Sequence, residues 1–224
     1  GEHIVPLASS QDHKPALDGD EGPNTGGMGA CSPAPVLSGD AYGRVLDTIL
    51  YPLVGALKKQ GITYRGVLYA GLMITDRGPY VLEFNARMGD PETQPLLMRL
   101  KSDLVPVLYE VAKGGSIKGM ELAWEDGPSV CVVMASGGYP GPYEKGKVIT
   151  GLADAGRVEG VKVFHAGTRL RDDRVVTSGG RVLGVTAQAP DLETAMGRAY
   201  RAAGLISFEG AHFRKDIGHK ALRR

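Results

Sequence analysis

The chain has 224 residues, of which 42% are hydrophobic and 23% charged, values ordinary for a globular protein with one large or two small domains. Its formal net charge of +1 gives no electrostatic case for nucleic acid or an anionic membrane as a partner. We expect neither a membrane-spanning helix nor a signal peptide, since the sequence shows no long apolar run. Cys31 and Cys131 lack metal-ligand spacing, so we expect no disulfide framework, no zinc site and a cytoplasmic location.

The first residues predict little regular structure. The chain opens on Gly1 without an initiator Met, so a fragment of a longer protein is one interpretation of the sequence. Residues 4–7 predict a short strand, and residues 9–14 predict a loop that ends before a proline. Lys14 in this loop either contacts an anion or is a solvated surface lysine.

Residues 18–33 are rich in glycine and predict a long loop. Glycine allows positive φ angles and close backbone approach, and consecutive exposed N–H groups can bind an anion. The stretch lacks the G-K-[ST] of a P-loop. Its three acids argue against a simple phosphate cradle unless a metal or an amine-bearing substrate is present. A plain surface loop is the alternative.

Residues 38–60 predict the clearest helix of the chain. Apolar residues recur every four positions, the spacing of one helix face, at Val45, Ile49, Leu53 and Leu57. Ser38 can cap this helix, Pro52 should kink it and Gly61 should end it. We interpret the apolar stripe as core.

Two segments, 65–75 and 79–85, predict the strands of an antiparallel hairpin with a turn at residues 75–78. The first is almost wholly apolar, so we expect it to be buried on both faces, with the hairpin inside a central sheet. The small Ala70 and Gly71 would leave room beside the second strand.

The second strand carries two oxygen-bearing side chains on one face. Alternation places Glu83 and Asn85 together and turns Leu82 and Phe84 to the other face, where they suit a core. The first pair lies roughly 6.6 Å apart along the strand. Two such oxygen donors can hold Mg²⁺ or Mn²⁺, cations that are commonly shared with substrate phosphates. An edge strand with both side chains in solvent is the alternative.

Two further polar residues follow the strand. Arg87 provides an always-charged fork that can grip phosphate or carboxylate. Asp90 comes before Pro91 and Glu92, and this order favours Asp90 as a helix N-cap. The cap leaves open whether Asp90 also does chemistry.

Residues 91–112 show a helical pattern in two pieces, interrupted near Ser102 and ended by Gly114-Gly115. We therefore predict a domain boundary between residues 115 and 116. The first domain would hold a mainly antiparallel sheet with helices.

Beyond the boundary, short predicted strands alternate with Gly/Pro turns, at residues 129–135, 161–166, 174–177 and 181–187. A helix is predicted at residues 192–203, capped by Asp191. This pattern indicates a small antiparallel α+β domain. His165 and the nearby arginines either contact phosphate or form a solvated hairpin.

Long motifs in this order resemble the phosphoribosylamine–glycine ligase family, the glycinamide ribonucleotide synthetases, which are ATP-grasp enzymes of purine biosynthesis. The motifs are G-P-N-T-G-G-M-G-A from Gly22, Y-A-G-L-M from Tyr69, L-E-F-N-A-R-M-G-D-P-E-T-Q from Leu82, G-G-Y-P from Gly137 and T-S-G-G-R-V-L from Thr177. They extend over nearly the whole chain. Met88 replaces an expected Phe, and Pro15 replaces an expected Arg.

The resemblance implies a fold and a reaction. Residues 1–115 would be the C-terminal portion of an ATP-grasp catalytic domain, and residues 116–224 a C-terminal α+β domain. ATP would phosphorylate glycine to glycyl phosphate, and 5-phosphoribosylamine would attack it, giving glycinamide ribonucleotide, ADP and phosphate. The implied partners are therefore ATP, glycine and 5-phosphoribosylamine, and we expect a monomer.

The resemblance also implies roles for individual residues. Glu83 and Asn85 would hold Mg²⁺ or Mn²⁺ against the nucleotide phosphates, and Arg87 would stabilise the transferring phosphoryl group. Asp90 would act with Arg87 at the catalytic site. The other residues implied to bind substrate are Asp20, as a contact for an amine, and the loop Asn24, Thr25, Gly26, Gly27 and Met28.

Two alternatives to this function stay open. Another ATP-grasp carboxylate–amine ligase would share the Glu83–Asn85 pair, although the glycine-rich loop favours the glycine ligase. A catalytically silent module is the second alternative, because the family has an N-terminal half that this chain lacks. Because that half is absent, the isolated chain is expected to be inactive on the ligase interpretation as well.

Overall fold

The structure, a computed structural model, describes residues 2–37 and 39–222. By its internal contacts the chain divides into two compact units that interleave along the sequence. The first unit comprises Gly1–Ser9, Ala34–Gly89 and Leu100–Trp124, and the second comprises Ser10–Pro33, Asp90–Arg99 and Glu125–Arg224. The expected α+β class is confirmed, since both units combine helices with antiparallel strands.

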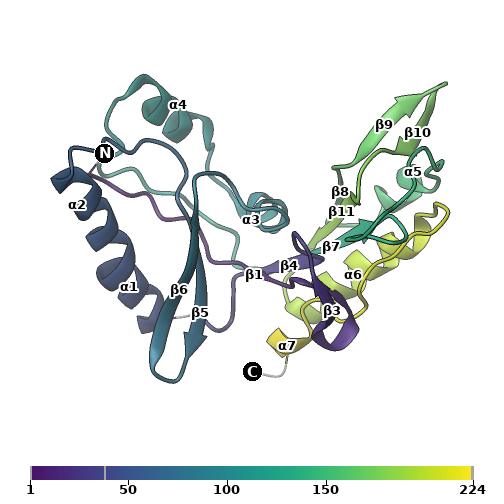
Figure 1. The fold of residues 1–224 in the computed structure, drawn as a ribbon, viewed down its shortest axis with the longest axis horizontal. Coiled ribbons are helices and arrows are strands. Elements are labelled where there is room, and N and C mark those ends of the chain that lie inside the picture. The colour runs from purple at the N-terminus through teal and green to yellow at the C-terminus, as the bar shows by residue number, and fades with distance from the viewer. Residues whose placement is uncertain (1, 38, 223–224) are drawn as a thin grey trace. The chain divides into compact units, whose positions relative to one another are not determined.

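A five-stranded antiparallel sheet forms the centre of the second unit (Figure 1). Its strand order is β1 (Gln11–Asp12), β4 (Gly29–Ser32), β7 (Ser129–Ala135), β11 (Arg181–Gln188) and β8 (Val161–His165). The strands predicted after the boundary are confirmed in place and direction. Three of them, β7, β11 and β8, share this sheet with two short strands from the first 33 residues, whereas the predicted strand at 174–177 lies in a separate two-stranded sheet.

Helices cover both faces of this sheet. All seven residues of β7 are buried, as a strand covered on two sides requires. On one face, α6 (Leu192–Leu205) packs a stripe of small residues against β7 and β11: Ala195, Ala199, Ala202 and Ala203. On the other face lies α3 (Thr93–Arg99), whose Gln94 side chain approaches Gly184 of β11. Asp191 caps α6 as predicted, because its side chain accepts the Thr194 N–H at 2.8 Å.

The first 33 residues hold more structure than their sequence suggests. No strand forms at residues 4–7, whereas the predicted loop at 9–14 contains β1. The glycine-rich stretch is not one loop. After β2 (Pro15–Leu17), it forms a 3₁₀ turn (Asp18–Asp20), β3 (Glu21–Asn24) and β4, and all four residues of β4 are buried. Glycine and alanine have low strand propensity, so burial in the sheet overrides local preference here.

The remaining elements of the second unit are short. A two-stranded sheet forms from β9 (Thr168–Arg171) and β10 (Arg174–Thr177), and β9 was not predicted. The two short helices are α5 (Leu152–Ala155) and α7 (His219–Leu222). Among residues 2–37 and 39–222, no helix has the length and apolar character needed to cross a membrane.

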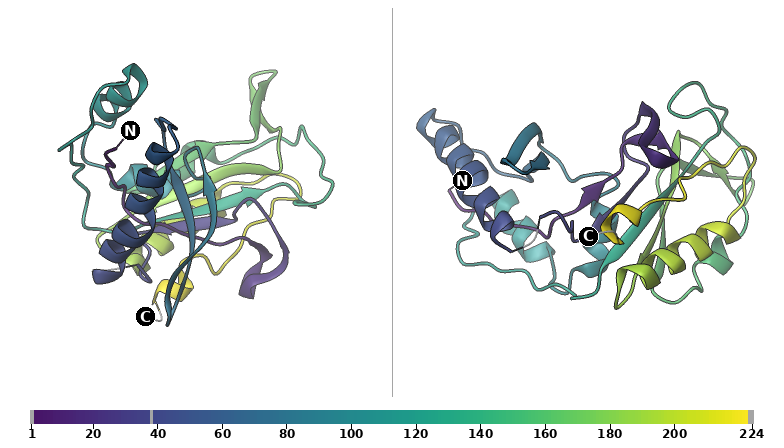
Figure 2. Two further views of the ribbon diagram at one scale, coloured as in Figure 1. Left: turned by 60° about the vertical axis from the view of Figure 1, so that its left-hand side comes forward. Right: turned by 90° about the horizontal axis from the view of Figure 1, so that it is seen from below.

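In the first unit, the long predicted helix is present in three pieces beside a hairpin (Figure 2). The pieces are α1 (Asp40–Val45), a π-helical turn (Leu46–Leu50) and α2 (Tyr51–Lys59). Pro52 lies at the start of α2, directly after the π turn, so the predicted irregularity takes this form. The predicted cap Ser38 lies outside the described residues. A separate helix, α4 (Val105–Lys113), confirms the second piece predicted after α3.

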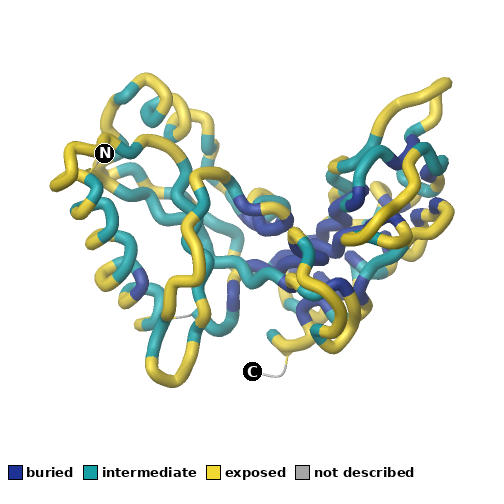
Figure 3. Tube along the Cα trace, in the orientation of Figure 1, coloured by how far each residue is buried: buried dark blue, intermediate teal, exposed yellow. Residues whose placement is uncertain are grey.

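The hairpin itself is confirmed, but its predicted surroundings are not. Strands β5 (Tyr69–Thr75) and β6 (Gly78–Asn85) pair antiparallel, yet they form a sheet of two strands rather than part of a central sheet. β5 is only half-buried, and Leu82 and Phe84 are 63% and 41% exposed. Figure 3 shows the contrast between this hairpin and the buried strands β7 and β11. Leu82 and Phe84 are exposed because none of the described residues forms a covering layer over them.

Candidate functional site

Glu83 and Asn85 lie on one face of β6, as alternation requires. Glu83 is exposed and Asn85 half-buried. Gly71 of β5 pairs directly with Glu83, and a Cβ built at Gly71 would lie 2.9 Å from Glu83 Cγ. The predicted space on the neighbouring strand is therefore real at Gly71, and the Glu83 side chain occupies it.

Arg87 lies close to this pair. Its Nη2 lies 3.5 Å from Asn85 Oδ1, and its Nη1 donates to the Met88 carbonyl at 3.0 Å. The exposed guanidinium retains further N–H donors for an anion. The first unit thus presents a carboxylate, an amide oxygen and a guanidinium on three alternate residues.

The donor set of this face fits Mg²⁺ or Mn²⁺. Both cations take oxygen ligands, and Mg²⁺ is commonly held by one or two protein groups plus substrate phosphates. Glu83 supplies a carboxylate and Asn85 a neutral carbonyl oxygen. Across the described residues no group of three or more His, Cys, Asp or Glu could hold a metal ion. A cation here would therefore take its remaining ligands from water and phosphate oxygens.

The glycine-rich loop of the second unit is fixed by its own hydrogen bonds. Thr25 Oγ1 donates to the Lys14 carbonyl at 2.6 Å and accepts the Gly27 N–H at 2.9 Å. Asn24 and Gly26 are exposed, and Thr25 is half-buried. Met28 is fully buried, so its side chain packs beneath the loop surface and offers no accessible atom to a ligand in this structure.

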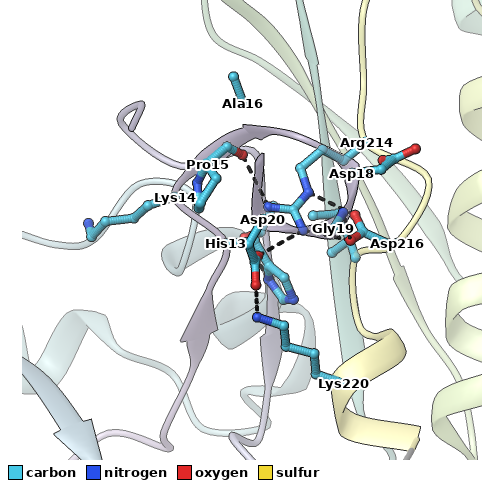
Figure 4. A network of polar contacts seen from close by, with 12 residues as sticks. His13, Lys14, Pro15, Ala16, Asp18, Gly19, Asp20, Arg214, Asp216 and Lys220 are labelled. Atoms are coloured by element: carbon cyan, nitrogen blue, oxygen red, sulfur yellow. Dashed lines mark hydrogen bonds and ion pairs between the residues drawn. The ribbon is translucent and has the colours of Figure 1, made fainter. Parts of the chain in front are cut away.

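Asp20 has cationic partners within the chain (Figure 4). Its Oδ1 accepts from Arg214 Nη2 at 3.1 Å, and its Oδ2 pairs with Lys220 Nζ. Arg214 is fully buried and also binds Asp216. These contacts give Asp20 a structural role, and its predicted contact with a substrate amine stays a prediction.

Asp90 is not the cap of helix α3, which begins three residues later at Thr93. Its two oxygens instead bind side chains: Oδ1 accepts from Gln94 Nε2 at 3.1 Å, and Oδ2 lies 3.0 Å from Arg181 Nη2. The Asp90 side chain remains 49% exposed, so a ligand can reach it. The Asp90–Pro91 peptide bond is cis.

Asp12, a buried acid next to the glycine-rich loop, was not predicted from the sequence. Its side chain is 9% exposed, and Lys14 Nζ lies 3.1 Å from Oδ2. A Cβ built at Gly27 would lie 2.6 Å from Asp12 Oδ1. Burial, and then the charge of Glu92, raises the pKa of Asp12 to about 6. Only the pairing of β1 with β4 brings this acid to the loop, and no local pattern predicts it.

The predicted site residues therefore form two groups. Glu83, Asn85 and Arg87 belong to the first unit. Asp90, Asp20 and the loop from Asn24 to Met28 belong to the second. Within each group, the contacts described above hold the side chains in place.

Two family models match the chain. Residues 1–93 match "Phosphoribosylglycinamide synthetase, ATP-grasp (A) domain", and residues 129–220 match "Phosphoribosylglycinamide synthetase, C domain". The predicted boundary at 115/116 falls between the two matches and stays a prediction.

Relatives and a solved structure that match this chain are named phosphoribosylamine–glycine ligase. The phosphoribosylamine–glycine ligase of Pseudomonas aeruginosa is 53% identical over 225 residues, covering 100% of this chain and 52% of the relative. The phosphoribosylamine–glycine ligase of Rhodopirellula baltica is 56% identical over 222 residues, covering 99% of this chain and 51% of the relative. The crystal structure of phosphoribosylamine–glycine ligase from Thermotoga maritima has a TM-score of 0.85 and 37% identity, covering 97% of this chain and 53% of that one. The chain spans about half the length of the relatives it matches. It belongs to the phosphoribosylglycinamide synthetase family, and it contains matches to both the ATP-grasp (A) domain and the C domain of that family.

Proposed function

We propose that this chain is part of an enzyme that joins glycine to 5-phosphoribosylamine at the expense of ATP. The observation that carries the proposal is identity above 50% along the whole chain to proteins named phosphoribosylamine–glycine ligase. The geometry agrees, because the oxygen donors and the guanidinium that such a reaction needs lie together at Glu83, Asn85 and Arg87.

The reaction proceeds in two steps. A glycine carboxylate oxygen attacks the γ-phosphorus of ATP, forming glycyl phosphate and releasing ADP. The neutral amine of 5-phosphoribosylamine then attacks the carbonyl carbon; the C–N bond forms, the C–O bond to phosphate breaks, and the nitrogen loses a proton. Catalysis of such steps consists mainly of positioning and charge stabilisation.

The residues of this chain take distinct roles in that scheme. Glu83 and Asn85 would hold Mg²⁺ or Mn²⁺, which when bound neutralises charge on phosphate oxygens. Arg87 binds the transferring phosphoryl group with its free N–H donors. Asp90 and the loop residues Asn24, Thr25 and Gly26 line the site for glycine and 5-phosphoribosylamine.

The test is phosphate release by the full-length protein that contains this chain, with each of the three substrates omitted in turn. Glu83→Ala should abolish release, whereas Asp76→Asn, which changes another exposed acid of the same hairpin, should leave it unchanged. Phosphate release that does not require glycine would sink the proposed substrate and favour another ATP-grasp ligase.

A second readout does not depend on activity. Mg²⁺ with ADP should raise the melting temperature of the full-length protein, and Glu83→Ala should remove the part of that shift that depends on Mg²⁺. Equal shifts in both proteins would contradict the assignment of Glu83 and would favour a catalytically silent module.

A further inference from the structure

The side chain of Arg181, at the start of β11, joins two segments that are distant in sequence. Its Nη1 donates to the Gly26 carbonyl at 2.9 Å and to the Asp90 carbonyl at 2.6 Å. Its Nη2 lies 3.0 Å from Asp90 Oδ2. The side chain is only 22% exposed, so these contacts are shielded from water more than an ordinary surface ion pair.

Gly26 is held on both sides of its peptide backbone. Its carbonyl binds Arg181, and its N–H donates to the hydroxyl of Tyr139 at 3.1 Å. A Cβ built at Gly26 would lie 2.9 Å from Arg181 Cζ, so the guanidinium packs directly against the glycine backbone. A larger residue at this position would push the guanidinium away.

The T-S-G-G-R motif around Arg181 accounts for this arrangement. A Cβ built at Gly180 would lie 2.3 Å from Tyr139 Cδ2, so the glycine makes room for the Tyr139 ring. The next residue, Arg181, then extends to the loop. Tyr139 and Arg181 both lie within the C domain match, whereas Gly26 and Asp90 lie within the ATP-grasp match.

We infer that Arg181 is a positioning residue of the substrate site, which fixes the Gly26 loop and the Asp90 carboxylate relative to each other. The inference rests on the proposed function. Arg181 supplies the counter-charge for Asp90 and leaves that side chain 49% exposed. The C domain thus supports the site for glycine and 5-phosphoribosylamine without touching the reacting atoms.

A lysine cannot replace this arginine. The planar guanidinium makes three contacts in one fork, to two carbonyls and one carboxylate, whereas an ammonium is a compact point charge on a flexible stem. Arg181→Lys therefore keeps the positive charge but cannot make the three contacts together. A loss of function in this variant would show that the contacts matter, and not the charge alone.

The test measures kcat and the KM of each substrate for Arg181→Lys in the full-length enzyme. We expect KM for glycine or 5-phosphoribosylamine to rise at least tenfold, with KM for ATP changed less than twofold. Arg198→Lys is the matched control, because Arg198 is 24% exposed and pairs with Glu159 away from the loop. Unchanged KM values in Arg181→Lys, or the same uniform losses in both variants, would overturn the inference.

Two further measurements test whether Arg181 holds the Gly26 loop in place. Tyr139→Phe removes only the hydroxyl that holds Gly26, and it should raise the same KM by a smaller factor. Amide hydrogen exchange at Gly26 and Gly27 should accelerate in Arg181→Lys while exchange in β7 stays slow. If the wild-type enzyme shows no ligase activity, the proposed function fails. Unchanged amide exchange at Gly26 and Gly27 in Arg181→Lys would refute the positioning role by itself.

Discussion

The fully buried guanidinium of Arg214 makes a bidentate ion pair with Asp216: Nε donates to Oδ1 and Nη2 to Oδ2, each at 2.8 Å (Figure 4). Burial of Asp216 opposes its charged form. The Arg214 hydrogen bonds and the Gly19 N–H outweigh that effect and lower the pKa of Asp216 to about 2. The same arginine binds Asp20 and the Pro15 carbonyl, so it fastens the segment before α7 to the start of the glycine-rich stretch.

Arg214→Met should therefore destabilise the protein by about 3–5 kcal/mol, because it leaves the carboxylates of Asp216 and Asp20 without their buried partner. Urea unfolding at neutral pH measures this loss. The control is Arg157→Met, which removes an exposed pair with Asp154 and should cost less than about 1 kcal/mol. Similar losses in both variants would show that Arg214 does not hold these segments together.

Asp12 and His13, adjacent in the chain, should affect the pH dependence of stability in opposite directions. Burial, and then Glu92, raises the pKa of Asp12 from 3.8 to about 6, so its contribution to the free energy of unfolding falls as pH rises through that range. Burial, and then the charge of Arg214, lowers the pKa of His13 from 6.5 to about 4, so its contribution grows with pH between 4 and 6.5.

Urea unfolding between pH 4 and 6.5 tests this pair. The wild type should show a shallow dependence, since the two contributions oppose each other. Asp12→Asn should expose the His13 contribution, and stability should then rise with pH. His13→Gln should expose the Asp12 contribution, and stability should fall with pH. Identical slopes in both variants would contradict these protonation states.

Gly27 should tolerate no side chain, for two separable reasons. Its φ is +119°, and a Cβ there would lie 2.4 Å from Pro91 Cδ. Gly66 also has a positive φ, +141°, but nothing lies within 4 Å of its Cβ position. Both alanine variants carry a backbone cost on the order of 1–3 kcal/mol. Only Gly27→Ala adds the overlap, so urea unfolding should show a clearly larger loss for it than for Gly66→Ala, and an equal loss would count against the overlap.

These residues also show which parts of the molecule were predictable. Strands β7, β8, β10 and β11 and helix α6 were predicted because their apolar patterns agree with their burial, as in β7 and α6, whereas the exposed β9 was missed. The hairpin was predicted because its two strands are local in sequence and joined by a short turn. The side chains that form the Glu83–Asn85 face follow from alternation along one strand.

The missed features depend on contacts between distant residues. β4 is recognisable only by its pairing with β7, and Asp12 is buried only because β1 pairs with β4. Arg181 reaches Gly26 from a strand more than a hundred positions away, which no local pattern predicts. The exposure of Leu82 and Phe84 was missed for a different reason: an apolar strand predicts a covering layer, and none of the described residues supplies it.

Gly71 provides a test of the Glu83 side chain that leaves Glu83 itself unchanged. Because a Cβ at Gly71 would lie 2.9 Å from Glu83 Cγ, Gly71→Ala should turn that side chain away from its place on β6 while the hairpin still forms. If Glu83 holds the cation, the Mg²⁺ concentration for half-maximal phosphate release by the full-length enzyme should rise several-fold.

Gly55→Ala is the control for this change. Gly55 lies in α2 with nothing within 4 Å of its Cβ position, and alanine is the better helix former, so stability should rise slightly and the Mg²⁺ dependence should stay that of the wild type. A Gly71→Ala enzyme with wild-type Mg²⁺ dependence would mean that the cation does not depend on the Glu83 carboxylate, and the oxygen donors would have to be sought elsewhere.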